Sequence, residues 1–142
     1  MIKKFEEIIT LKRGFDLPEH NRIHGIYPLY AASGLSDFVN SFKIHGPGVI
    51  TGRSGTIGQV FYTEEDFWPL NTTLFVADFH GNNEKYISYW LSTFNLENYS
   101  SGASVPTLNR NELNGLECVV HNAFEQQHIV DTLRRKFYGT IN

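Results

Sequence analysis

Apolar residues change their spacing along the chain, and this change divides it into strands and helices. From residue 27 to residue 77 they form short β-branched and aromatic runs separated by Gly, Asn and Ser, a pattern typical of strands joined by turns. These runs predict strands at residues 27–32, 49–51, 57–62 and 72–77, and a later run predicts another at 115–120. The polar stretches at residues 35–43 and 98–111 are expected to be connecting loops, because Ser, Asn and Asp favour turns.

A helical period replaces this pattern at residues 84–94. Tyr86, Ile87, Trp90, Leu91 and Phe94 fall on one face of a helix there, and we expect this aromatic stripe to be part of the core. A short amphipathic turn is also expected near residues 5–9.

The last segment of the chain predicts another helix. Asn122 precedes Glu125 by three residues, which is the spacing of a capping box, and the helix continues to about residue 137. The basic run at residues 134–136 would steer it toward an acidic surface. An apolar stripe on this helix either packs on the body of the domain or binds a helical partner. The stripe consists of Ile129, Val130, Leu133 and Phe137.

The mixture of strands and helices without regular alternation predicts an α+β fold. We expect a compact, twisted and mostly antiparallel sheet with a few packed helices, ending in the helix described above. A chain of 142 residues, 41% of them hydrophobic, is long enough for one domain with its own core.

The cysteine, histidine and hydropathy patterns exclude several classes of protein. Cys118 is the only cysteine, so no intrachain disulfide is possible; a cytoplasmic setting is expected, and apolar neighbours favour a core residue over a reactive thiol. No apolar run approaches the ~20 residues of a membrane span. The histidines lack metal-binding spacing, and no nucleophile has assignable acid or base partners. We therefore expect no metal, no cofactor and no catalytic residue.

Residues 46–60 form the most distinctive segment, because five glycines punctuate two strand-like runs. Near its centre, Arg53, Ser54 and Thr56 offer one cation and two hydroxyl groups beside backbone N–H groups, a combination suited to an anionic oxygen. The alternative is a glycine-rich hairpin whose polar residues face water. A phosphate-binding P-loop is excluded, since no Lys followed by Ser or Thr comes after the last glycine.

The charge of the chain is unevenly distributed. Net charge is −3, which argues against indiscriminate binding of nucleic acid. However, residues 1–58 hold seven Lys/Arg and five Asp/Glu, whereas residues 59–125 hold two and nine. This favours either a basic face or a mixed, solvated surface. The residues that would form a basic face are Lys12, Arg13, Arg22, Lys43, Arg53 and Arg110.

Five motifs follow one another in a recognisable order. They are YPLYAASG at 27–34, GRSGTIG at 52–58, Trp68 with NTT at 71–73, the loop 102–108 around Pro106, and EQQHIVDTL at 125–133. Each is weak alone, but their succession resembles the target recognition domain of the specificity subunit of type I restriction–modification systems. One departure is the HNAF sequence at 121–124, where that family usually has prolines.

The resemblance implies a function as well as a fold. Such domains catalyse nothing. They read one half of a split double-stranded DNA target, on which methylation subunits and, in some assemblies, a restriction subunit act. Residues 1–121 are then the expected recognition domain, and residues 122–142 the start of a conserved helix that contacts another subunit or a second copy of this chain. A half-length subunit, a truncated gene or a fragment would have this arrangement. The alternative is an enzyme or ligand-binding domain built around residues 52–58.

The resemblance also divides the expected DNA contacts into two groups. The glycine motif recurs in family members with different targets, so Arg53, Ser54 and Thr56 are expected to contact phosphate or brace the neighbouring loop. Polar loops are expected to read bases, because Asn, Arg and Ser match the donors and acceptors of base edges, although some of them will instead cap turns. The candidates are Ser36, Asn40, Ser41, Lys43, Ser104, Asn109, Arg110 and Asn111.

Overall fold

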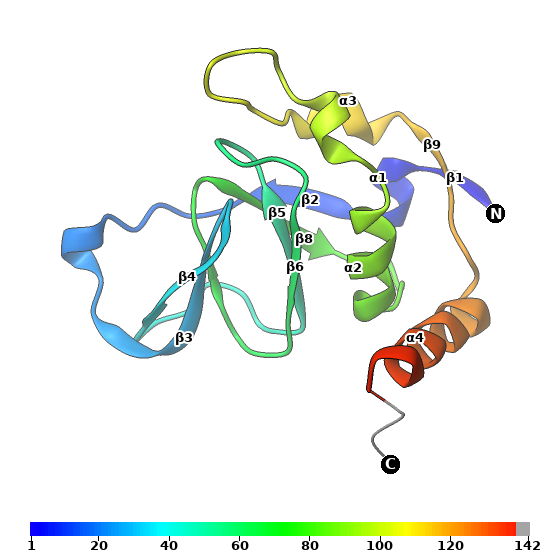
Figure 1. Cartoon of the computed structure of the whole chain (residues 1–142), viewed down its shortest axis with the longest axis horizontal. Coiled ribbons are helices and arrows are strands. Elements are labelled where there is room, and N and C mark those ends of the chain that lie inside the picture. Colours follow the sequence, from blue (N-terminus) through cyan, green and yellow to red (C-terminus); the bar gives the residue numbers. More distant parts are fainter. Residues whose placement is uncertain (139–142) are drawn as a thin grey trace.

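The computed structural model describes the backbone of residues 1–138 and the side chains of residues 1–136. At its centre lies a four-stranded antiparallel sheet with the order β2-β8-β5-β6 (Figure 1). Its strands are β2 (Thr10–Arg13), β5 (Gly48–Gly52), β6 (Val60–Thr63) and β8 (Thr73–Asp78). β5 is buried along its whole length, because it pairs with β6 on one side and β8 on the other. The loop that follows β5 therefore starts from a fixed position.

A second sheet extends away from the helices and forms the left-hand part of the molecule in Figure 1. It consists of β4 (Gly34–Val39), β3 (His24–Ala31) and β7 (Trp68–Pro69), and a 3-10 turn at Glu19–Asn21 precedes it. β3 pairs antiparallel with β4 and parallel with β7. Its small core contains Leu29, Val39, Trp68 and Leu70.

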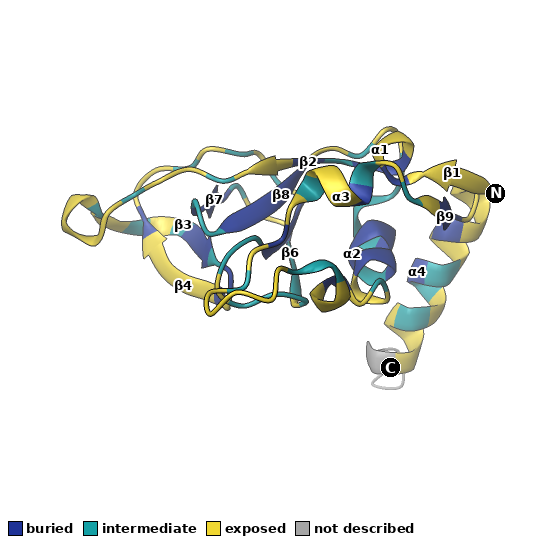
Figure 2. Cartoon of the chain, turned by 90° about the horizontal axis from the view of Figure 1, so that it is seen from above, coloured by how far each residue is buried: buried dark blue, intermediate teal, exposed yellow. Residues whose placement is uncertain are grey.

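The expected loop at residues 35–43 is wrong for its first half, because Ser36 and Asp37 lie in β4. Leu35 to Phe38 are all exposed, so the strand lacks the alternation of apolar and polar positions that would reveal it. Figure 2 shows this strand as an exposed ribbon at the edge of the molecule.

The first and last parts of the domain body meet in a third, two-stranded sheet. β1 (Ile2–Lys4) pairs antiparallel with β9 (Glu117–Val119). Between β1 and β2 lies a single helical turn, α1 (Phe5–Ile8), as expected for this segment. The short helix α3 (Arg110–Asn114) precedes β9 and was not expected.

The main core lies between the central sheet and α2 (Glu84–Ser92), which a 3-10 turn at Leu96–Tyr99 follows. The expected aromatic stripe is confirmed as core along α2, whereas Phe94 follows the end of the helix and is half-buried against that core. The Phe5 ring lies 5.6 Å from the Trp90 ring and 5.5 Å from the Phe94 ring, between centroids. Cys118 is 6% exposed and belongs to the same core. The α+β class and the mostly antiparallel pairing are confirmed, with the strands divided among three sheets.

The final helix, α4 (Ala123–Tyr138), begins with the expected capping box. The Glu125 N–H donates to Asn122 Oδ1 at 2.9 Å, and the Asn122 N–H donates to Glu125 Oε1 at 3.2 Å. Val130, expected on a face open to a partner, is instead 3% exposed and packs into the domain's own core. Leu133 is half-buried, and the Phe137 side chain lies outside the described residues.

Gln126 attaches α4 to the beginning of α2. Its side chain is 2% exposed, and its Nε2 donates to Asn82 Oδ1 at 2.8 Å and to the His121 carbonyl at 2.7 Å. Its Oε1 accepts from the Asn83 N–H at 2.9 Å. Because Asn83 is the N-cap of α2, one buried amide joins both helices and the segment before α4.

The glycine motif forms the predicted β5–β6 hairpin, although β6 begins at Val60 rather than at Ile57. Gly52, the last residue of β5, is a point of close backbone approach. A Cβ atom there would overlap the Thr56 carbonyl oxygen and would also lie 3.2 Å from the Ala32 Cβ. Glycine is therefore needed for the loop to fold back against the end of β5.

Gln126→Leu tests the attachment of α4. Three polar groups would lose their partner, so we expect the free energy of unfolding to fall by about 2 kcal/mol in urea denaturation. The control is His128→Leu, at an exposed position of the same helix, with an expected change within about 0.5 kcal/mol. Equal effects of Gln126→Leu and His128→Leu would contradict the role given to Gln126.

Gly52→Ala tests the close approach within the hairpin. The added methyl group forces the loop away from β5, and we expect the unfolding free energy to fall by roughly 1–3 kcal/mol. Gly102→Ala is the matched control, because a Cβ at Gly102 meets nothing within 4 Å and should be tolerated. An unchanged urea midpoint for Gly52→Ala would show that the loop yields without cost.

Candidate nucleic-acid interface

The hairpin loop at residues 53–59 is held by neighbouring segments on both sides. The Arg53 and Ser54 N–H groups donate to the Thr72 carbonyl at 2.8 and 3.2 Å. The Gly55 N–H donates to the Pro106 carbonyl at 2.9 Å, and the Arg53 carbonyl accepts from the Leu108 N–H at 2.8 Å. These bonds join the loop to the turn before β8 and to the segment before α3.

The side chain of Arg53 is also fixed. Its Nε donates to the Asn71 carbonyl at 2.8 Å. Burial lowers the pKa of Arg53, and the positive charges of Arg13 and Arg110 lower it further. The direction of this pKa shift reflects first the burial of the Arg53 guanidinium and then the neighbouring positive charges.

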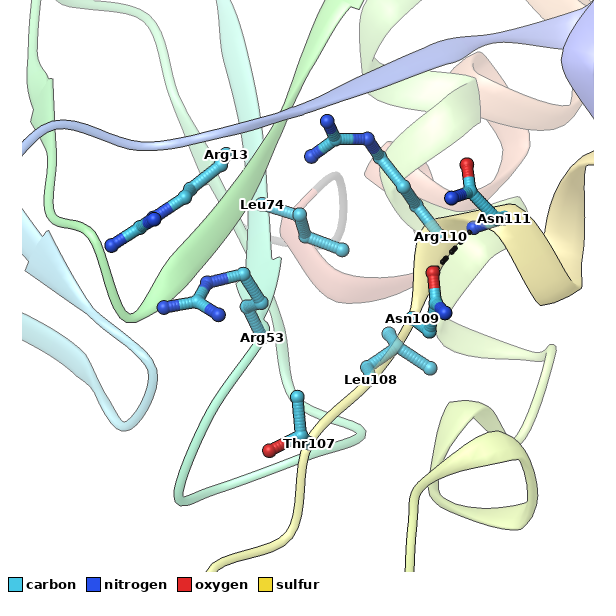
Figure 3. A pocket seen from close by; sticks show the side chains of 8 residues that line it. All are labelled: Arg13, Arg53, Leu74, Thr107, Leu108, Asn109, Arg110 and Asn111. Atoms are coloured by element: carbon cyan, nitrogen blue, oxygen red, sulfur yellow. Dashed lines mark hydrogen bonds between the residues drawn. The ribbon is translucent and has the colours of Figure 1, made fainter.

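These three arginines line one cavity of about 310 Å³ (Figure 3). Arg13 comes from the end of β2, Arg53 from the hairpin loop and Arg110 from the start of α3. They are distant in sequence. The pairing of β2 with β8, which also pairs with β5, brings Arg13 close to the hairpin loop, and the hydrogen bonds of that loop to Pro106 and Leu108 bring the segment before α3 there. The remaining lining residues are Leu74, Thr107, Leu108, Asn109 and Asn111.

A second hollow of about 480 Å³ shares Arg13 with the first. Here the Lys43 Nζ lies 5.0 Å from the centroid of the Trp68 ring and 5.6 Å from that of Phe15. The Trp68 Nε1 donates to the Phe15 carbonyl at 3.0 Å, which holds the two aromatic residues together. Sequence reasoning missed Phe15, which is 37% exposed, since one aromatic residue beside a glycine gives no pattern. Asp16, Gly14 and Asn71 complete the lining.

Other expected contact residues lie apart from this pair of cavities. Arg22 and Ser36 line a different hollow, of about 430 Å³, together with Glu19, His24 and Asp37. The Arg22 Nε donates to the Leu17 carbonyl at 3.0 Å. The structure therefore brings Arg13, Lys43, Arg53 and Arg110 to adjoining cavities, and places Arg22 elsewhere.

The polar candidates differ in how free their side chains are. Asn40, Ser41, Ser104 and Asn111 are exposed, whereas Ser54 and Thr56 are half-buried in the hairpin loop. Asn109 caps α3, because its Oδ1 accepts from the Asn111 N–H at 3.0 Å. Lys12 is exposed on β2 and lines neither cavity.

Asp16 lines the second cavity, but in the described part of the chain no carboxylate forms an ion pair within 4.0 Å with the basic side chains of the two cavities. Within the described residues, the ion pairs join His45 to Asp66 and His80 to Asp78. The same part of the chain contains no group of three side chains suited to a metal ion. Nor does any described helix have the length and apolar character needed to cross a membrane.

The exposed side of the α2–α4 contact carries a separate, apolar groove of about 220 Å³. Ile129 and Leu133 of α4 face Tyr86, Tyr89 and Trp90 of α2 across it. The Tyr86 hydroxyl is hydrogen-bonded to His121 Nδ1 at 2.8 Å, at one end of the groove. Part of the predicted apolar stripe is therefore left lining an open groove, although Val130 is not.

Comparison with known proteins agrees with this architecture. Two solved structures share the fold: the S subunit of a type I restriction–modification system from M. genitalium (TM-score 0.79, 18% identity, 94% of this chain, 37% of that one) and the HsdS subunit from Thermoanaerobacter tengcongensis (TM-score 0.69, 12% identity, 95% and 36%). At these identities the likeness concerns the fold alone.

Sequence comparison gives the family. The chain is 26% identical over 146 residues to the type I restriction enzyme EcoprrI specificity subunit of Escherichia coli, an alignment that covers 99% of this chain and 36% of that protein. It thus spans about a third of the length of that relative. Residues 1–141 match the family described as the type I restriction modification DNA specificity domain. The chain therefore belongs to the family of type I restriction–modification DNA specificity domains.

Proposed function

We propose that this domain binds double-stranded DNA and reads one half of a split target within a type I restriction–modification complex. One observation carries the proposal: four cations from separate segments, Arg13, Lys43, Arg53 and Arg110, line adjoining cavities without carboxylate partners among the described residues. Although the net charge of the chain is −3, these four positive charges lie on one surface. Such a surface fits the phosphate backbone of nucleic acid.

We assign phosphate contacts and base contacts to different residues. Arg53 is held by both its backbone and its side chain, so it suits a phosphate contact that fixes the orientation of the DNA. Base reading is assigned to exposed polar side chains, which can adapt to a groove. These are Asn40, Ser41, Lys43, Ser104 and Asn111, with Ser36 in the separate hollow beside Arg22.

The role proposed for the chain is recognition without catalysis, inside the cytoplasm where its DNA target lies. Residues 1–121 would form the recognition domain, and the helix that begins after Asn122 would continue into the conserved helices of the complex. The alternative of an enzyme around residues 52–58 is less favoured, since the Ser54 hydroxyl has no His or carboxylate hydrogen-bonded to it in the described part of the chain.

The partner site is assigned to the groove between α2 and α4. Ile129 and Leu133 leave apolar surface open there, beside the basic residues Arg134, Arg135 and Lys136. Such a surface suits a helix with acidic residues at its margin. A methylation subunit is the proposed partner; a restriction subunit or a second copy of this chain would be recognised by the same chemistry.

Arg53→Ala tests the DNA proposal. The change removes one phosphate contact, so we expect affinity to fall alike for all duplex sequences, and the dependence of log affinity on log salt to become shallower by about one unit. The measurement is a fluorescence-anisotropy titration of several duplexes over a range of salt concentrations, with the methylation subunit present.

Two variants serve as comparisons. Lys3→Ala removes a charge from β1, outside the two cavities, and should leave the salt dependence unchanged. Asn40→Ala should instead change the preference among duplexes. If Arg53→Ala altered the preference and left the average affinity intact, the division between positioning and reading residues would be wrong.

Leu133→Ser tests the partner groove. A polar side chain there removes apolar contact, and we expect co-purification with the methylation subunit to fall roughly tenfold or more. Thr132→Ala, on the exposed side of the same turn, should have no effect. Circular dichroism gives the second measurement: if Leu133→Ser unfolds the chain, the residue belongs to the domain's own core and the docking proposal is wrong.

A further inference from the structure

Resting on the proposed DNA role, we propose that Arg13, Arg53 and Arg110 form a preformed seat for a single phosphate group. The three side chains line the 310 Å³ cavity from three different elements, as Figure 3 shows. Arg110 was expected to read bases; the seat assigns it instead to the backbone of the ligand. The domain would thus hold one phosphate with three guanidinium groups before any base is contacted.

The position of Arg53 is fixed before a ligand arrives. Its backbone is bonded to Thr72 and Leu108, and its Nε to the Asn71 carbonyl. The two terminal Nη groups have no hydrogen-bond partner in the described part of the chain and remain available to an oxyanion. Preorganisation of this kind lowers the entropy that a ligand must remove on binding.

Electrostatics gives the second argument. Three like charges that share a cavity repel one another, and no carboxylate within 4.0 Å relieves them among the described residues. The lowered pKa of Arg53, caused by burial and then by Arg13 and Arg110, agrees with this crowding. An oxyanion placed between the groups would convert the repulsion into attraction.

The lining of the cavity selects a phosphate over a base. It contains no aromatic ring on which a base could stack; the neighbouring hollow, by contrast, contains Phe15 and Trp68. Guanidinium groups match the geometry of phosphate oxygens and bind them in pairs. The adjoining hollow shares Arg13, so a phosphate in the seat would place the next nucleotide close to Lys43 and the aromatic pair.

Titration of the full chain with inorganic phosphate tests the seat. The titration is monitored by ¹H–¹⁵N spectra that include the arginine Nε signals. We expect saturable shifts at Arg53 and Arg110, and a roughly tenfold or greater loss of affinity in Arg110→Gln. Lys12→Gln is the matched control, since it removes a charge from the same strand as Arg13 without touching the cavity. The inference would be overturned if phosphate shifted the signals of Lys12 as much as those of the three arginines. It would also be overturned if Arg110→Gln left the phosphate-induced shifts unchanged.

A second readout separates this role from a structural one. Removing Arg110 relieves repulsion, so in phosphate-free buffer at low salt the Tm of Arg110→Gln should equal or exceed that of the unaltered chain, and phosphate should no longer raise it. A lower Tm in that buffer, with phosphate still stabilising the variant, would mean that Arg110 supports the fold and binds no phosphate.

Competition identifies the source of the phosphate group. If the seat takes a DNA phosphate, inorganic phosphate should weaken duplex binding more than chloride at equal ionic strength, and this excess should vanish in Arg110→Gln. Saturable phosphate binding without competition would support a seat for a free phosphate or nucleotide. DNA binding with no specific response to phosphate would overturn the seat but not the proposed function. Phosphate binding without any DNA binding would overturn the proposed function but not the seat.

Discussion

The hydrogen bonds of residues 53–55 join the segments that form the candidate nucleic-acid interface of this domain. They join a loop from the central sheet to the Thr72 carbonyl on one side and to the segment around Pro106 on the other. β5, buried between two neighbours, supplies the rigid base. These bonds bring α3 beside the hairpin loop, and the pairing of β2 with β8 brings Arg13 there, although the charges of the three arginines repel one another. The backbone N–H and carbonyl groups of this loop are paired within the domain, which leaves the side chains of the cavities available for a ligand.

The local sequence pattern was enough to predict those elements that depend on residues close together in the chain. Alternation, glycine spacing and the helical period gave the β5–β6 hairpin, the core face of α2 and the capping box at Asn122. Each of these features is decided by residues within a few positions of one another. The mixture of strands and helices gave the α+β class, the resemblance added the family, and the comparisons confirm both.

Contacts between distant segments could not be predicted in this way. Ser36 lies in a strand whose two faces are exposed, so β4 left no periodic signal. The charge distribution left a basic face and a mixed, solvated surface open, and Arg22, which lies between the 3-10 turn at Glu19–Asn21 and β3, lines a hollow separate from that of Arg53. Phe15 and Trp68 gain their significance only through Lys43, which the fold brings from another segment. Such neighbours are set by strand order, which one sequence does not reveal.

The pairing of β1 with β9 has a consequence for how such a domain can be exchanged. Lys4 lies opposite Glu117, and the Met1 amino group donates to the Val120 carbonyl at 3.0 Å, so the recognition body starts and finishes at the same place (Figure 1). The chain between these two strands therefore leaves the β1–β9 sheet and returns to it. A body of different length and sequence would leave α4 in place if it kept these two strands, the start of α2 that binds Gln126 and the core surface that covers Val130. Recombination at this junction that preserved these contacts would therefore replace one recognition body with another and keep the geometry of the helices outside it.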